Sequence, residues 1–112
     1  MSANKNYLIK KYQAPSGNVP FDDWFANLPD QIQARIETRL DRLSLGNFGD
    51  CSSIGGGVYE LRFFFGPGYR VYFGLLNQTL VLLLCGGNKN SQRKDIRLAQ
   101  TLWREFKKEK RK

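Results

Sequence analysis

Apolar and polar positions alternate along residues 58–65 and again along residues 69–73, with the period of two that is typical of β-strands. The glycine-proline-glycine sequence at 66–68 predicts a turn that joins these two strands as an antiparallel hairpin. Residues 80–85 are apolar at every position, which is typical of a central strand that is covered on both faces. Residues 7–12 alternate well enough to predict a further strand near the N-terminus.

Two amphipathic helices are predicted between the first strand and the hairpin. Apolar side chains recur at helical spacing from Phe21 to Leu28, after Pro20, a residue suited to the first turn of a helix. Pro29 begins a second helix, which we expect to end near Leu45. Residues 47–56, with glycines at their end, are predicted to form a loop.

A last amphipathic helix follows the central strand, with Asn90 or Ser91 as its N-terminal cap. Its basic tail, residues 104–112, carries six cations and two glutamates. We expect this tail to fray and to contact phosphates nonspecifically or an acidic partner.

Composition narrows the chemistry that is available. The chain has 112 residues, 41% of them hydrophobic, which suits one domain spanning residues 1–112. A net charge of +8 favours a polyanionic or acidic partner. There is no histidine, so any chemistry must use Lys, Arg, Tyr, Glu or Asp. The adjacent Asp22 and Asp23 lack supporting carboxylates, and we expect neither a metal site nor a cofactor.

The cellular setting is predicted from three negative features. The N-terminus has no apolar segment of the signal-peptide type, and the longest apolar run, residues 80–85, is far too short to span a bilayer. Cys51 and Cys85 do not have the spacing of a metal or redox motif, and Cys85 continues an apolar strand. A reduced, cytoplasmic setting is therefore expected.

The polar faces of the two hairpin strands form the candidate site. Glu60 and Arg62 share a face of the first strand, Arg70 and Tyr72 share a face of the second, and Lys89 follows in the next loop. Arginine forks and a lysine suit a phosphodiester, and Glu60 or Tyr72 is a candidate for moving a proton or orienting a ribose. Alternatively, Glu60 forms an ordinary ion pair with an arginine across the hairpin.

Further basic residues are candidates for contacts with an RNA backbone. They lie on the second helix and at the start of the last helix: Arg35, Arg39, Arg42, Arg93 and Lys94. On the second helix they alternate with acidic residues, so the set is also consistent with a solvated face of i,i+4 pairs.

Four segments, GVYELR, GPGYRVYF, LLLCGGNKNSQRKDI and AQTLW, resemble the RelE/ParE superfamily of type II toxins, and within it the phage-derived Gp49-like, HigB-type addiction module killer proteins. The resemblance implies a small α+β fold, with an antiparallel sheet of about four strands. Two early helices would pack on one side of this sheet, followed by a C-terminal helix. It also implies a ribosome-dependent mRNA endonuclease that needs no metal and is neutralised by a helix-turn-helix antitoxin of the HigA type.

Carried over residue by residue, the resemblance matches Arg70 to the catalytic arginine of RelE-type toxins. Arg62 falls where that motif carries a lysine, and Lys89 lies near a second basic catalytic position. Glu60 also stands where a lysine is usual, and no tyrosine follows Tyr72, so the general base stays open. Two alternatives remain: the ParE branch of the superfamily inhibits DNA gyrase without cutting RNA, and a prophage remnant would be inactive.

Overall fold

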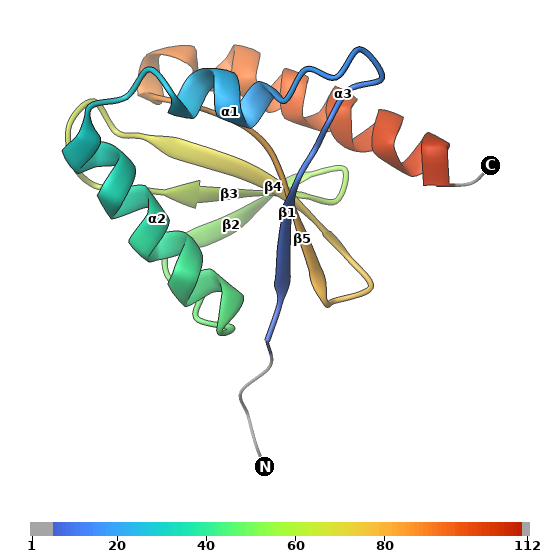
Figure 1. Ribbon diagram of the computed structural model, residues 1–112, viewed down its shortest axis with the longest axis horizontal. Helices are drawn as coiled ribbons and strands as arrows, with labels where there is room; N and C mark the ends of the chain where they lie inside the picture. The colour runs from blue at the N-terminus through green and yellow to red at the C-terminus, as the bar shows by residue number, and fades with distance from the viewer. Residues whose placement is uncertain (1–5, 111–112) are drawn as a thin grey trace.

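The computed structural model, which describes residues 6–110, arranges five strands in the order β1-β5-β4-β3-β2 (Figure 1). The strands are β1 (Leu8–Lys11), β2 (Cys51–Gly55), β3 (Val58–Arg62), β4 (Arg70–Leu76) and β5 (Leu80–Gly87). The helices are α1 (Pro20–Phe25), α2 (Asp30–Ser44) and α3 (Gln92–Lys110), with a 3₁₀ turn, η1 (Lys89–Ser91), before the last. The predicted α+β class is confirmed, with one strand more than expected and one parallel pair, β1 with β5.

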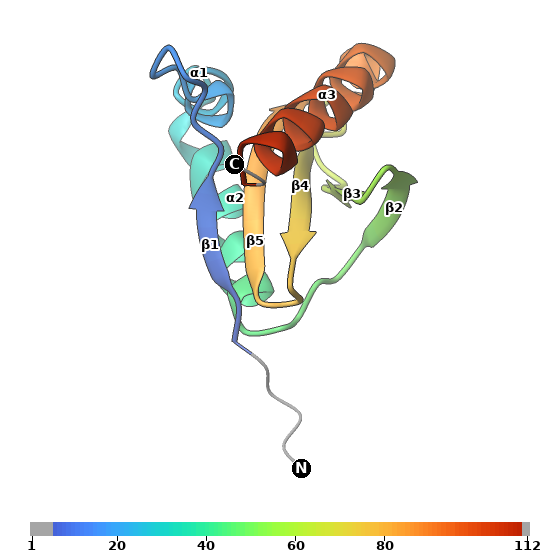
Figure 2. The same ribbon diagram turned by 90° about the vertical axis from the view of Figure 1, so that its right-hand side faces the viewer.

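The sheet lies between two helical layers. α1 and α2 cover one face, where Phe21, Ile36 and Leu43 pack against Leu61 and Phe73. α3 covers the other face, and its Ala99 and Trp103 join a second core cluster with strand residues. In Figure 2, α2 passes behind β1 and β5 while α3 crosses in front of β5 and β4. The two early helices thus share one side, as predicted, and the C-terminal helix takes the opposite side.

Two tryptophans bring the helices close to the sheet. A Cβ atom at Gly74 would collide with the ring of Trp103 on α3, and one at Gly86 would collide with the ring of Trp24 on α1. The absence of a side chain at these positions lets an aromatic ring lie directly on the strand backbone. Both glycines therefore set the distance between the layers.

Two local predictions are wrong. Residues 51–55, expected within a loop, form β2, because their backbone pairs with β3 although serine and glycine favour strands weakly. Asn88 caps the 3₁₀ turn η1, since its side chain accepts from the backbone N–H groups of Asn90 and Ser91, and α3 begins at Gln92, directly after Ser91. The basic tail does not fray through residue 110, because α3 continues to Lys110. Residues 111–112 lie outside the described range.

No helix within residues 6–110 combines the length and the apolar character needed to cross a membrane.

Candidate functional site

The hairpin brings the two polar pairs together, as predicted. Glu60 lies opposite Tyr72, and Arg62 lies opposite Arg70, in the antiparallel β3–β4 ladder. The turn at residues 66–68 closes the hairpin, with the Gly68 N–H donating to the carbonyl of Phe65 at 3.2 Å.

Glu60 is the centre of a buried polar cluster. The residue is 3% exposed, and its Oε2 accepts hydrogen bonds from the Tyr72 hydroxyl at 3.2 Å and from Gln92 Nε2 at 2.8 Å. The same oxygen lies 3.3 Å from Nε of Arg70. A buried carboxylate is tolerated when it is paired in this way. These four residues, Glu60, Arg70, Tyr72 and Gln92, are called the Glu60 cluster below.

The burial of the cluster corrects the expectation that the polar face is open to ligand. α3 lies over this face, and Tyr72 is 0% exposed, so its ring is not available for stacking on a base. Burial, followed by the neighbouring Glu60 charge, raises the pKa of the Tyr72 hydroxyl above its ordinary value and keeps it a hydrogen-bond donor. The ion pair of Glu60 across the hairpin, which the sequence left as an alternative, is the arrangement that the structure contains.

Gln92 is the member of the cluster that sequence reasoning missed. It is the first residue of α3 and reaches Glu60 from a position 32 residues along the chain. A single polar residue at a helix start carries no periodic signal. Only the docking of α3 on the sheet brings it to Glu60.

Arg70 connects the buried cluster to the surface. Its side chain is 14% exposed, and Nη1 donates to the carbonyl of Gly68 at 2.8 Å. Nε is buried and has no aligned hydrogen-bond acceptor, although Glu60 is close enough for an ion pair. The guanidinium of Arg70 is therefore held by the carboxylate of Glu60 and by the carbonyl of Gly68 in the turn.

Arg70, Arg62 and Lys89 line one pocket of about 470 Å³, together with residues 63–68. This set of residues is called the Arg70 pocket. Gly68 lies between two of the cations: a Cβ there would be 3.3 Å from Arg70 Nη1 and 3.6 Å from Lys89 Cβ. The three predicted cations thus share one cavity, whereas Glu60 and Tyr72 lie behind it.

Arg62 is paired with a residue that the sequence did not single out. Its Nε and Nη2 donate to the two carboxylate oxygens of Asp50 at 3.1 and 3.0 Å, a bidentate arrangement. This hydrogen bonding raises the pKa of Arg62. Asp50 directly precedes β2. Because the sequence pattern did not predict that strand, it did not indicate this ion pair either.

The predicted RNA-contact residues lie in two hollows that adjoin the Arg70 pocket. The α3 hollow is lined by residues 89–94 and Arg97, and therefore includes Arg93 and Lys94. The α2 hollow is lined by Arg35, Thr38, Arg39, Arg42 and residues 63–65. The first shares Lys89 with the Arg70 pocket and the second shares residues 63–65, so the three form one continuous basic surface.

Arg39 and Arg35 also support the fold. Arg39 lies 4.7 Å from the ring centre of Phe63 and donates to the carbonyl of Arg62 at 2.8 Å, and burial lowers its pKa. Arg35 lies 4.6 Å from the ring centre of Phe65. The α2 arginines are therefore not a freely solvated row, because two of them are stacked on the loop that forms the Arg70 pocket.

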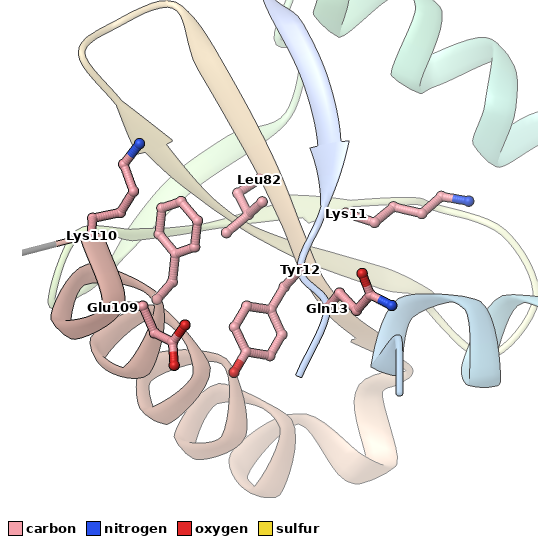
Figure 3. Close-up of a pocket in the computed structure, with 7 residues that line it drawn as sticks. Lys11, Tyr12, Gln13, Leu82, Glu109 and Lys110 are labelled. Atoms are coloured by element: carbon pink, nitrogen blue, oxygen red, sulfur yellow. The ribbon is translucent and has the colours of Figure 1, made fainter. Parts of the chain in front are cut away.

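A separate pocket of about 400 Å³ lies between the end of β1 and the last turns of α3 (Figure 3). Its lining includes Tyr12, Leu82 and Phe106, with lysines and a glutamate at the rim. Figure 3 shows the Tyr12 ring between β1 and α3. None of the candidate residues lines this pocket, and its mixed charges do not favour a phosphate.

Comparison with known proteins places the chain in a family. A model of the family described as "Phage derived protein Gp49-like (DUF891)" matches residues 23–104, a range that contains all of the candidate residues. The chain is also similar to an uncharacterized protein of Haemophilus influenzae, 48% identical over 89 residues, which cover 79% of this chain and 90% of the relative. The predicted resemblance is confirmed: the chain belongs to the Gp49-like family of RelE/HigB-type addiction module toxins.

Proposed function

We propose that this protein is the toxin of a type II toxin–antitoxin system and acts as a metal-independent, ribosome-dependent endonuclease on mRNA. Family membership supports the toxin role. The observation that carries the nuclease assignment is the convergence of Arg70, Arg62 and Lys89 on one pocket. That pocket lies in the middle of a continuous basic surface, which suits a polyanionic strand.

Arg70 is the main stabiliser of the transition state in this proposal. During cleavage the ribose 2′ oxygen attacks the adjacent phosphorus, and negative charge accumulates on the phosphate oxygens. A guanidinium that is already held in place stabilises this charge without reorganisation. Arg70 meets that condition, because Glu60 and the Gly68 carbonyl hold it. Arg62 assists from the other side of the pocket while paired with Asp50.

Lys89 is assigned the proton transfer. Apart from the arginines, it is the one titratable side chain among the described residues that line the Arg70 pocket. Arginine does not lose its proton in proteins, so it cannot act as the base. As an amine, Lys89 would take the proton of the 2′-OH, and the ammonium so formed would give a proton to the 5′ oxygen of the next nucleotide as its bond to phosphorus breaks. The products are a 2′,3′-cyclic phosphate and a 5′-hydroxyl end.

Glu60 and Tyr72 are assigned positioning roles, since both are buried behind Arg70. A chain with one lysine as its base and no histidine relies on placement of the substrate. The ribosome supplies that placement by presenting single-stranded mRNA at a fixed site. The neutralising partner in this proposal is a helix-turn-helix antitoxin of the HigA type.

The test is a short induction of the toxin alone in a bacterial host, followed by mapping of mRNA 5′ ends. We expect cuts within translated messages that carry 5′-hydroxyl ends, and their loss in Arg70→Lys and Arg70→Ala. The lysine variant is included because alanine leaves the buried Glu60 without its counter-ion. Intact mRNA combined with a loss of DNA supercoiling would instead indicate inhibition of gyrase.

A further inference from the structure

Phe64 is an aromatic side chain that the fold leaves in solvent. It is 84% exposed, and within residues 6–110 the other large exposed hydrophobic side chains are the leucines Leu8, Leu45 and Leu98. Phe64 follows the end of β3, where neither helical layer covers it. Exposure of a whole phenyl ring is unfavourable in water, so this position is a candidate for contact with a partner.

The loop holds Phe64 from both sides. Phe63 is 2% exposed and packs in the core next to α2, and Phe65 packs against the same core. The rings of Phe63 and Phe65 meet edge to face at 5.8 Å between centroids. Arg39 and Arg35 stack on these two rings. Phe64 thus lies between two residues whose side chains are packed against the core.

Phe64 separates two groups of cations. It lines the Arg70 pocket, with Arg62, Arg70 and Lys89, and it also lines the α2 hollow, with Arg35, Arg39 and Arg42. A cationic groove that follows a backbone, with an aromatic side chain along its length, is the usual arrangement for binding single-stranded nucleic acid. A second copy of this chain would bring cations against cations at this surface, so charge complementarity favours RNA.

We propose that Phe64 stacks on a nucleobase of single-stranded RNA, next to the phosphate that Arg70 contacts. The location of that phosphate rests on the proposed function. The stacked base continues the strand from the Arg70 pocket toward the α2 hollow. Because every base has a π face, the contact is tolerant of sequence and sets the position of the strand rather than its identity.

The test uses a uridine-rich RNA oligonucleotide with 2′-O-methyl groups throughout, which prevents cleavage, and one 2-aminopurine, whose fluorescence is quenched on stacking. The wild-type protein should quench the probe. Phe64→Leu, which keeps an apolar side chain but removes the π face, should lose the quenching and bind on the order of 10-fold more weakly. The salt dependence of binding should be unchanged, because no phosphate contact is lost.

Leu45→Ala is the matched control, since Leu45 is 62% exposed and lies at the end of α2, outside the Arg70 pocket and both hollows. It should bind and quench like the wild type. Three results would overturn the proposal: no quenching by the wild-type protein, equal quenching by Phe64→Leu, or loss of a self-associated species in Phe64→Leu with unchanged RNA binding.

This test separates the stacking from the nuclease assignment. If the wild-type protein quenches the probe through Phe64 but leaves translated mRNA intact in cells, the stacking holds and the endonuclease proposal fails. If mRNA is cut in cells while Phe64→Leu quenches like the wild type, the endonuclease stands and the stacking proposal is wrong.

Discussion

Glu60 lies beneath Arg70 with its Oε2 3.3 Å from Nε of the arginine, and the side chain of Glu60 is 4% exposed whereas that of Arg70 is 14% exposed. Glu60 therefore does not face the cavity in which the other cations meet. It holds the arginine that does. Glu60, which its chemistry alone made a candidate for moving a proton, thus supports Arg70 in the fold.

Glu60→Gln keeps the shape of the side chain and removes its charge. Arg70 would then be a buried cation without a counter-ion, and we expect a loss of about 3 kcal/mol in the free energy of unfolding. Urea unfolding of both proteins at neutral pH measures this difference in the free energy of unfolding. A variant as stable as the wild type would show that the pair does not hold the arginine.

Tyr72→Phe removes one hydrogen bond to Glu60 and leaves the ring in place. The expected cost is about 1 kcal/mol of stability, with mRNA cleavage retained, because the ring and hydroxyl do not reach the Arg70 pocket. Cleavage by the purified variant on translating ribosomes provides the measurement. Loss of cleavage in a folded Tyr72→Phe protein would mean that the hydroxyl acts directly on the RNA.

Gly68→Ala tests the turn that aligns Arg70 with Lys89. Gly68 has φ +77, and an added methyl group would press on Nη1 of Arg70 and come into ordinary contact with Lys89. We expect a loss of roughly 1–2 kcal/mol from the left-handed backbone, and a cleavage rate lower by on the order of 10-fold or more.

Gly17→Ala is the control for that prediction. Gly17 has φ +94, but the nearest atom to an added Cβ is Gln13 Nε2 at 4.0 Å. Neither Gly17 nor Gln13 lines the Arg70 pocket. It should be destabilised to a similar degree and cleave normally. If both substitutions slowed cleavage equally, the effect of Gly68→Ala would come from lower stability of the fold and not from the alignment of Arg70 with Lys89.

Alkaline pH should destabilise the fold through Cys85. Burial raises the pKa of its thiol from 9.0 to about 12, so the unfolded chain loses this proton first. The stabilisation is complete below pH 9 and is lost as pH rises from 9 toward 12, at about 1.4 kcal/mol per pH unit. Urea unfolding from pH 8 to 11 measures the slope, which should be shallower in Cys85→Ala. An equal slope in both proteins would contradict the burial of the thiol.

Periodicity predicted that the two polar pairs of the hairpin meet, and it predicted the composition of the first core. The odd-numbered side chains of β3 face α1 and α2, as the alternating pattern requires, and Glu60 lies opposite Tyr72. Residues 63–69 connect the two strands. The pattern also predicted α2 to within a residue at each end, Asp30 to Ser44, because a proline and a glycine flank it.

The same pattern did not reveal what covers the polar face. An amphipathic segment such as α3 must pack on something, but its sequence does not say on which side of the sheet. Because α3 packs on this side of the sheet, it buries Glu60 and Tyr72 and brings Gln92 within hydrogen-bond distance of Glu60. β2 was missed because backbone pairing, rather than the side chains of Ser52 and Ser53, makes it a strand, and Asp50 was missed with it.

In the proposed function, Arg70 carries the cleavage of mRNA on the ribosome. The most direct measurement is the single-turnover rate of mRNA cleavage on purified translating ribosomes by wild type, Arg70→Lys, and the double variant Glu60→Gln/Arg70→Ala, in which no buried charge is left unpaired. We expect both variants to fold and to cleave on the order of 10²–10³-fold more slowly. Cleavage at the wild-type rate by either variant would show that the guanidinium of Arg70 does not stabilise the transition state.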